Sequence, residues 1–194
     1  MQAPTQLLTY EEYLELPYTG RRTEFIDGRV IELAQPHPNH NDIIEELQFY
    51  LKQEFKGSNL VAKREIQVKI PRFGQNNRGR DPDLVVCTRE QWKEIKRTST
   101  TSVFGAGNPP LIAVEVLSPG NWRQDMNEKQ AEYARAGVPE YWRINPMEGQ
   151  RWVETMTMGE ARMYESIGVF RGGDRIISKV LSELELTAQQ VLDV

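Results

Sequence analysis

The stretch Leu111-Ile112-Ala113-Val114-Glu115-Val116-Leu117 contains one polar residue, Glu115, within an otherwise apolar run. A continuous apolar run of this kind is typical of a β-strand buried on both faces, as in the sheet of an α/β protein. Because burying a carboxylate without a partner is costly, Glu115 is expected to have a partner or a function. The stretch therefore predicts a central strand with an acid built into it.

A second acid precedes another apolar run. Leu84-Val85-Val86-Cys87 begins directly after Asp81-Pro82-Asp83, so an acid lies at the mouth of another predicted core strand. If Asp83 and Glu115 converge at one end of the sheet, a divalent cation would relieve their repulsion. Carboxylate oxygens are ligands that Mg²⁺ and Mn²⁺ prefer. The two runs together predict a Mg²⁺ or Mn²⁺ site.

Length and composition predict a single domain over residues 1–194. The chain has 194 residues and 39% hydrophobic content, enough for one sizeable core. Its single cysteine, Cys87, excludes a disulfide framework and a cysteine-rich zinc site, so we expect a reduced, cytoplasmic setting. The sequence has no apolar stretch of the roughly 18 residues that a membrane span needs. The acidic N-terminal segment around Glu11, Glu12 and Glu15 does not resemble a signal peptide, so neither a membrane location nor secretion is expected.

The charge distribution leaves two readings of one basic stretch. The net charge of −4 argues against a protein that coats nucleic acid indiscriminately. Between residues 61 and 80, however, basic side chains outnumber a single acid, Glu65; they are Lys63, Arg64, Lys69, Arg72, Arg78 and Arg80. One reading is that this stretch guides a polyanion toward Asp81 and Asp83. The other is that it is a solvated hairpin edge protected by its charges.

Local patterns predict the elements around the two core strands. Thr9 and Glu12 form a capping-box pattern at the start of a short helix over 9–16, and Asp27-Gly28 predicts the tight turn of a hairpin over 23–33. Farther on, the patterns predict an amphipathic helix over 39–55 closed by Gly57, extended chain over 60–70, a polar loop over 71–79, a strand over 84–87, a helix over 90–96, a loop over 98–108, a turn over 118–120, a helix over 122–136 ended by Gly137, strands over 140–145, 151–156, 162–167 and 175–178, and a closing helix over 187–192.

Lys129 is the cation of most interest on the helix expected over 122–136. It lies three residues after Met126 and four before Tyr133, beside the stripe expected to face the protein, with Asp125 one turn earlier. Apolar surroundings disfavour the charged form of a lysine. We therefore expect a lowered pKa for Lys129, which would suit proton transfer.

Four segments follow one another in a characteristic order. They are Glu24-Phe25-Ile26-Asp27-Gly28, Asp81-Pro82-Asp83-Leu84-Val85-Val86, Val114-Glu115-Val116-Leu117-Ser118-Pro119, and Lys129 leading into Tyr133-Ala134-Arg135-Ala136-Gly137-Val138-Pro139-Glu140-Tyr141-Trp142. Together they resemble the Uma2 family of endonucleases, within the PD-(D/E)XK nuclease superfamily. The resemblance implies an α/β fold with a restriction-endonuclease-like mixed β-sheet core flanked by helices, with added N-terminal and C-terminal β-hairpins. It also implies Mg²⁺-dependent phosphodiester hydrolysis at one edge of the sheet.

The resemblance assigns roles to three residues of the central motifs. Asp83 and Glu115 match the two metal-ligating acids of the family. The superfamily pattern places a lysine two residues after the glutamate, but Leu117 occupies that position here, and Lys129 on the following helix is the substitute. Two alternatives remain open: Asp81 is the ligand in place of Asp83, or Glu115 forms a salt bridge to Lys129 with no metal at all.

Two further residues are candidates for the site. By the same resemblance, Glu24 corresponds to an N-terminal acid that helps to hold the metal or its water. Its alternative is a structural ion pair with Arg21 or Arg22 at the start of the hairpin. His40, beside Asn39, resembles a histidine that recurs in the family, although a lone histidine is more often a cap or a structural donor.

These assignments predict a metal-dependent nuclease that hydrolyses DNA, with a homodimer as the expected assembly because cutting both strands commonly pairs two active sites. One alternative is a catalytically inactive module that uses the same fold for interaction or dimerisation. Another is an RNA-directed phosphodiesterase, which would share the metal site. A hydrolase with a side-chain nucleophile has less support, because the chain lacks a Gly-x-Ser-x-Gly motif and Cys87 lies in a predicted core strand.

Overall fold

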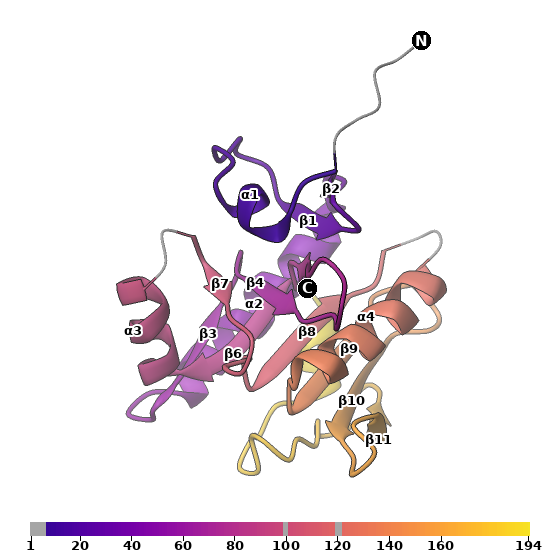
Figure 1. Cartoon of the computed structure of the whole chain (residues 1–194). Helices are drawn as coiled ribbons and strands as arrows, with labels where there is room; N and C mark the ends of the chain where they lie inside the picture. Colours follow the sequence, from indigo (N-terminus) through magenta and orange to yellow (C-terminus); the bar gives the residue numbers. More distant parts are fainter. Residues whose placement is uncertain (1–6, 99–100, 119–121) are drawn as a thin grey trace.

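The computed structural model describes residues 7–98, 101–118 and 122–194, with the side chains of 122–124 excepted (Figure 1). The helices are α1 (Tyr10–Leu14), α2 (Pro38–Glu54), α3 (Arg89–Thr98), α4 (Trp122–Ala136) and α5 (Ala188–Leu192). The strands are β1 (Thr23–Ile26), β2 (Arg29–Glu32), β3 (Leu60–Lys63), β4 (Gln67–Ile70), β5 (Arg78–Arg80), β6 (Leu84–Thr88), β7 (Val103–Phe104), β8 (Ile112–Val116), β9 (Glu140–Asn145), β10 (Trp152–Met158) and β11 (Tyr164–Phe170). Among the described residues, no helix is long and apolar enough to cross a membrane.

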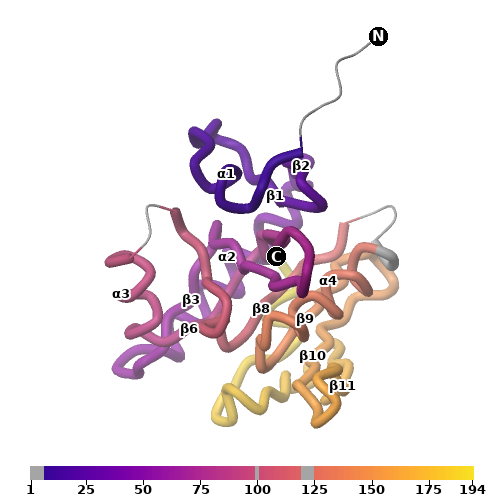
Figure 2. Tube along the Cα trace, viewed as in Figure 1, coloured from indigo at the N-terminus to yellow at the C-terminus, as the bar shows by residue number. Residues whose placement is uncertain are grey.

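The strands form two sheets flanked by helices. One has the order β2-β1-β5-β4-β7 and the other the order β11-β10-β9-β8-β6-β3. Both are mixed, because β4 and β7 run parallel in the first sheet, and β8 and β9 run parallel in the second. The β1–β2 and β10–β11 hairpins lie at opposite ends of the molecule (Figure 2). The predicted α/β class, with a mixed sheet and both added hairpins, is confirmed.

The central strand β8 is buried on both faces, as its apolar run predicts. Val114 and Val116 belong to the core cluster that α2 and α5 complete. Ala113 belongs to the cluster on the other side of the sheet, together with Tyr133 of α4. Because successive side chains of a strand alternate between faces, Glu115 shares the α4 side with Ala113.

The smaller sheet is organised by the same alternation. Tyr10 and Tyr13 of α1 pack against Phe25 of β1, with the Tyr13 and Phe25 ring centroids 4.9 Å apart in a stacked arrangement. Glu24, the neighbour of Phe25 in β1, therefore points to the opposite face, toward α4. Helix α4 thus receives acidic side chains from both sheets.

The Asp81-Pro82-Asp83 motif lies where the chain passes from one sheet to the other. Strand β5 before it belongs to the smaller sheet, and strand β6 after it belongs to the larger one. The earlier passage, from β3 to β4, occurs around Glu65, whose positive φ of 58° turns the chain. The segment predicted as one extended run over 60–70 is therefore two strands in different sheets.

Several local predictions are confirmed in detail. The Thr9 hydroxyl accepts from the Glu12 backbone N–H, and the Glu12 carboxylate accepts from the Thr9 N–H, which is the complete capping box. Asp27 and Gly28 have φ values of 50° and 82°, as the tight hairpin turn requires at both central positions. Helix α4 has the bounds that the sequence predicts, and Gly137 after it has a φ of 86°.

The strand predicted over 175–178 was wrong. Within that range the structure has a single bridge, which joins Arg175 to Thr187. The next backbone N–H groups along the chain donate to the Glu140 carboxylate instead of to a neighbouring strand. Within 175–178 the Ile176 N–H donates to the Leu186 carbonyl at 2.8 Å, so the segment makes an isolated bridge and is then held by Glu140 instead of continuing as a strand.

Two predicted loops contain short strands. The loop expected over 98–108 includes β7, which pairs with β4 and buries Phe104 completely. The polar loop expected over 71–79 runs into β5, which is held between β1 and β4. Strands of two or three residues are too short for a periodic pattern to reveal them. Most of the turn expected over 118–120 lies outside the described residues.

Candidate active site

Asp83 directly precedes β6, and Glu115 lies on β8, its antiparallel neighbour, at the junction of the two sheets. The register that pairs Leu84 with Val114 places Asp83 opposite Glu115. The Val116 backbone N–H donates to Asp83 Oδ2 at 2.9 Å, which ties the aspartate to the strand of the glutamate. The two acids are only 7% and 2% exposed. Two carboxylates are thus held close together with almost no water to separate their charges.

Asp83 is surrounded by donors. Arg22 Nη1 lies 3.0 Å from Asp83 Oδ1, and His40 Nε2 lies 3.2 Å from Oδ2. Burial raises the pKa of this carboxyl. The contacts with His40, the charge of Arg22 and the Val116 N–H outweigh this effect and lower the pKa to about 2. Asp83 is therefore a carboxylate at neutral pH.

Glu115 has a different environment, although it is equally buried. Lys129 Nζ lies 3.1 Å from its Oε2, and the Tyr133 hydroxyl donates to its Oε1 at 2.6 Å. Burial raises the pKa of Glu115, and the charges of Asp83 and Glu24 add to this effect against the opposing charge of Lys129, so the pKa rises to about 7. Burial is the main cause of the raised pKa, and the nearby Asp83 and Glu24 carboxylates add to it.

Tyr133 is a site residue that the sequence reasoning placed only in the core. It is fully buried, as expected, but its hydroxyl is bonded to Glu115. Burial raises the pKa of Tyr133 well above its ordinary value, so the hydroxyl remains a donor. The available signal was its spacing, since Tyr133 follows Lys129 by four residues and shares its face of the helix.

The expectation of a lowered pKa for Lys129 was wrong. Burial lowers the pKa of Lys129, but the carboxylates of Glu115, Glu24 and Asp125 together raise it well above its ordinary value. These oxygens lie 3.1, 3.4 and 3.5 Å from Nζ. Asp125 lies on α4 itself, one turn before Lys129, but Glu24 and Glu115 come from strands of the two sheets and are brought to the ammonium only by the fold. Lys129 is therefore an ammonium ion at neutral pH.

Glu24 lies on the same side of α4 as Glu115, but its partners differ from those expected. It pairs with Arg80, whose Nη1 lies 2.6 Å from Oε2, and with Lys129. Arg21 pairs with Glu32 instead, and Arg22 with Asp81 and Asp83. Burial raises the pKa of Glu24, but the charges of Lys129 and Arg80 lower it below its ordinary value.

The geometry distinguishes Asp81 from Asp83. Asp81 accepts from Arg22 Nε at 2.7 Å, and its other oxygen is buried without a hydrogen-bond partner. Asp83, not Asp81, lies opposite Glu115 and is bonded to the strand that carries it. This arrangement supports Asp83 as the member of the pair that shares a ligand with Glu115.

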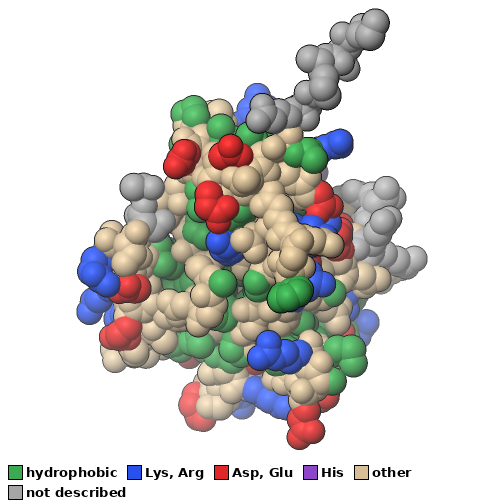
Figure 3. Space-filling view, in the orientation of Figure 1, with side chains coloured by type: hydrophobic (Ala, Val, Ile, Leu, Met, Phe, Trp, Pro, Cys, Tyr) green, Lys and Arg blue, Asp and Glu red, His purple; other side chains and the backbone are tan. Residues whose placement is uncertain are grey.

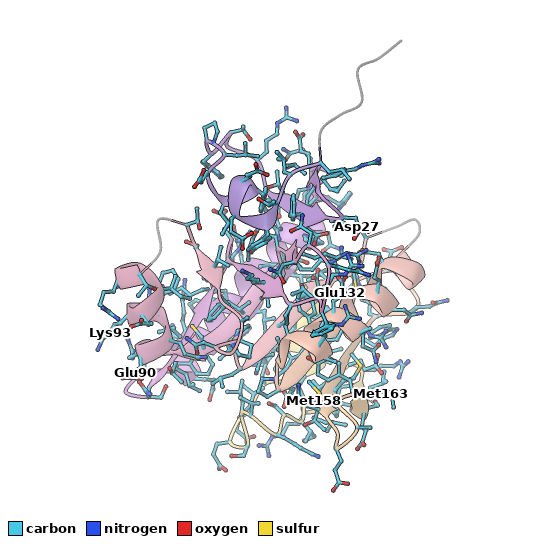
Figure 4. All side chains as sticks on the ribbon, viewed as in Figure 1. Asp27, Glu90, Lys93, Glu132, Met158 and Met163 are labelled. Atoms are coloured by element: carbon cyan, nitrogen blue, oxygen red, sulfur yellow. The ribbon has the colours of Figure 1, made fainter. Side chains whose placement is uncertain are left out.

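Two arginines of the basic stretch face inward. Arg78 Nη1 lies 2.6 Å from Glu132 of α4, and Arg78 also pairs with Asp27 in the β1–β2 turn. Figure 4 labels these two acids. Arg80 is buried among carboxylates. On the face in Figure 3, the described Lys and Arg side chains are interspersed with Asp and Glu. Arg78 and Arg80 therefore fit neither interpretation of the basic stretch: they neither form a surface that guides a polyanion nor protect a solvated edge.

The donor chemistry of the pair fits a hard divalent ion. Mg²⁺ is commonly bound by one or two carboxylates and completes its shell with water and substrate phosphate oxygens. Asp83 and Glu115 supply two such carboxylates, and the charge of Asp83 contributes, after burial, to the raised pKa of Glu115. Within the described residues, no group of three His, Cys, Asp or Glu side chains is arranged to hold a metal. Asp83 and Glu115 are the two carboxylates that would hold such an ion.

The raised pKa of Glu115 gives a test of this electrostatic picture. Because Glu115 binds its proton more tightly in the folded protein than in the unfolded chain, the folded protein loses stability as the pH rises from about 4.5 to about 7. In EDTA, the free energy of unfolding of the wild type should therefore fall across this window relative to Glu115→Gln, by up to about 1.4 kcal/mol per pH unit. Urea denaturation measures the difference. A difference independent of pH would contradict the raised pKa, and Glu154→Gln on β10 is the matched control.

Comparisons with known proteins bear on the family and the fold of the chain. Residues 10–189 match a family model described as "Uma2: Putative restriction endonuclease". The fold is similar to a crystal structure titled as a "putative nuclease belonging to DUF820" from Anabaena variabilis, with a TM-score of 0.75 and 21% identity over 96% of this chain and 98% of that one. No curated protein matches the chain. The structural likeness confirms the predicted nuclease-type α/β fold.

Proposed function

The chain belongs to the Uma2 family, and from this premise we propose that it is a metal-dependent endonuclease that hydrolyses phosphodiester bonds of DNA. The observation that carries the proposal is the pair Asp83 and Glu115, buried opposite each other on neighbouring strands with a lysine ammonium beside them. The repulsion between two buried carboxylates that lie opposite each other is what a divalent cation would relieve.

Asp83 and Glu115 would hold the metal, Mg²⁺ or Mn²⁺, which when bound supplies Lewis-acid polarisation of the scissile phosphate and of a water. Because its pKa is raised, Lys129 acts as a fixed positive charge and a hydrogen-bond donor, not as a base. It would steady the negative charge that develops on the phosphate in the transition state. This role replaces the proton transfer expected from the sequence.

The other residues of the site would hold Asp83, Glu115 and Lys129 in position. His40 and Arg22 hold the Asp83 carboxylate in one orientation. Tyr133 does the same for Glu115. Glu24 contacts the Lys129 ammonium and would hold either this cation or a water of the metal. We further propose a homodimer, since a symmetric pair of sites can address both strands of a duplex.

Cleavage tests the proposal directly. We expect the purified protein to cut plasmid DNA in Mg²⁺ or Mn²⁺ but not in EDTA, and Asp83→Asn to lose this activity because it removes a ligand charge. Single-stranded DNA and RNA are offered in parallel to define the substrate. Asp193→Asn, an exposed carboxylate that pairs with Arg151, is the control and should cut like the wild type. Cleavage that persists in Asp83→Asn would sink the site assignment.

Metal binding tests the same site without turnover. A ligand that binds only the folded state stabilises it, by about 2.7 kcal/mol at a hundredfold excess over its dissociation constant. We therefore expect Mg²⁺ or Mn²⁺ to raise the melting temperature of the wild type but not that of Asp83→Asn. Differential scanning fluorimetry with and without EDTA makes the measurement. A wild type that shows neither a shift nor cleavage would favour an inactive interaction module.

A further inference from the structure

Arg80 lies at the centre of the ion pairs beside the candidate site. Its side chain is 1% exposed, so it has almost no surface to offer to a substrate. Its Nη1 lies 2.6 Å from Glu24 Oε2 on β1, and its Nε donates to Glu132 Oε2 on α4 at 2.5 Å. One planar guanidinium therefore joins the smaller sheet to the helix that carries Lys129.

Glu24 connects this guanidinium to the site. Its Oε2 is taken by Arg80, and its Oε1 lies 3.4 Å from Lys129 Nζ. The same ammonium lies 3.1 Å from Glu115 Oε2. The contacts thus form a continuous series of alternating charges from Arg80 through Glu24 and Lys129 to Glu115.

We infer that Arg80 is a positioning residue of the proposed nuclease: by holding and neutralising Glu24, it keeps the Lys129 ammonium beside Glu115. The inference rests on the proposed function. Without the guanidinium, Glu24 keeps its full charge and draws Lys129 toward itself, away from Glu115. Lysine cannot replace Arg80, because a single ammonium does not reach β1 and α4 in two directions at once.

Arg78 is the control that distinguishes a positioning role of Arg80 from simple neutralisation of buried acids. It lies on the same strand as Arg80 and pairs with Glu128 and Glu132 of the same helix. Its contact on the other side is Asp27 instead of Glu24. Replacing Arg78 therefore removes comparable ion pairs to α4 but leaves the contacts of Glu24 and Lys129 intact.

Steady-state kinetics compare Arg80→Gln with Arg78→Gln, with rates expressed per folded molecule. Because a small misplacement of a catalytic group is costly, Arg80→Gln should lower kcat by about 10²-fold. The KM for DNA should change by no more than about twofold, since Arg80 is buried away from substrate. Arg78→Gln should lower kcat by no more than about threefold. Arg80→Lys, which keeps a cation but not the fork, serves if Arg80→Gln does not fold and should lose about tenfold. Equal losses of kcat in the variants of the two arginines would overturn the inference.

A double-mutant cycle tests whether Arg80 acts through Glu24. If it does, Arg80→Gln adds no further loss of kcat in a Glu24→Gln background, because the group that it positions is already removed. Losses that multiply in the double variant would show that Arg80 acts independently of Glu24. A purely structural role predicts this second result.

The Lys129 ammonium itself gives a readout that does not depend on cleavage. In protein labelled with ¹⁵N-lysine, its side-chain resonance is assigned by its loss in Lys129→Arg. Arg80→Gln should shift this resonance, and Arg78→Gln should leave it in place. If Arg80→Gln shifts this resonance but the wild type cuts no substrate, the positioning role is supported and the nuclease function is rejected. An unchanged resonance in Arg80→Gln would reject the positioning role whatever the protein cuts.

Discussion

Glu115→Gln is expected to reduce metal-dependent DNA cleavage by on the order of 10²–10³-fold while the protein stays folded. Glutamine keeps the shape of the side chain and an acceptor for the Tyr133 hydroxyl. It removes the charge that would hold the metal and that holds Lys129 at 3.1 Å. The substitution also relieves the repulsion with Asp83, so the fold should not suffer greatly.

The measurement is the initial rate of plasmid nicking, with circular dichroism to confirm folding. Glu154→Gln is the matched control, because Glu154 is also a strand glutamate paired with one cation, Arg143, on β9. It should retain cleavage. If Glu115→Gln cuts as fast as this control, the glutamate is a structural partner of Lys129 and the metal site is elsewhere.

The largest effect on stability is expected for Glu140→Ala. Glu140 is fully buried at the start of β9 and accepts from the Trp142 indole N–H at 2.6 Å and the Ser178 hydroxyl at 2.6 Å. It also accepts from the Lys179 and Val180 backbone N–H groups at 2.8 and 3.0 Å. Alanine would leave these buried donors without an acceptor and release the C-terminal segment from the sheet.

We expect Glu140→Ala to lower the free energy of unfolding by about 3–5 kcal/mol, the range for breaking a buried charged network. Urea denaturation measures the change. Glu185→Ala, which removes an exposed ion pair with Arg175, is the control and should change stability by less than about 1 kcal/mol. Equal effects of the two substitutions would show that the Glu140 contacts do not anchor the segment.

The two acids of the candidate site could be found from the sequence because they interrupt apolar runs. The sequence alone shows that Glu115 lies within an apolar run and that Asp83 directly precedes another. Because a buried carboxylate needs a partner, both positions indicate a site before the fold is known. By contrast, the spacing of Tyr133 from Lys129 places the two on one face of the helix but does not show that the tyrosine hydroxyl donates to Glu115. Arg80 read as one more cation of a basic stretch until the fold buried it among acids.

The sequence by itself determined the elements whose signals are local. The capping box at Thr9, the Asp27-Gly28 turn, the bounds of α4 and the buried strand around Glu115 are all encoded by neighbouring residues. Such signals depend on spacing and backbone conformation within a few residues, so they can be recognised before any tertiary contact forms.

Only the tertiary structure decided the partners and charge states. The fold adds the carboxylates of Glu24 and Glu115 to that of Asp125, four residues earlier on α4, within 3.5 Å of the Lys129 Nζ, and so raises the pKa of the lysine. The strands β5 and β7 likewise exist because neighbouring strands pair with them. Electrostatic energies and short pairings depend on groups that are distant in the chain and close in space, and burial decides which of them dominates.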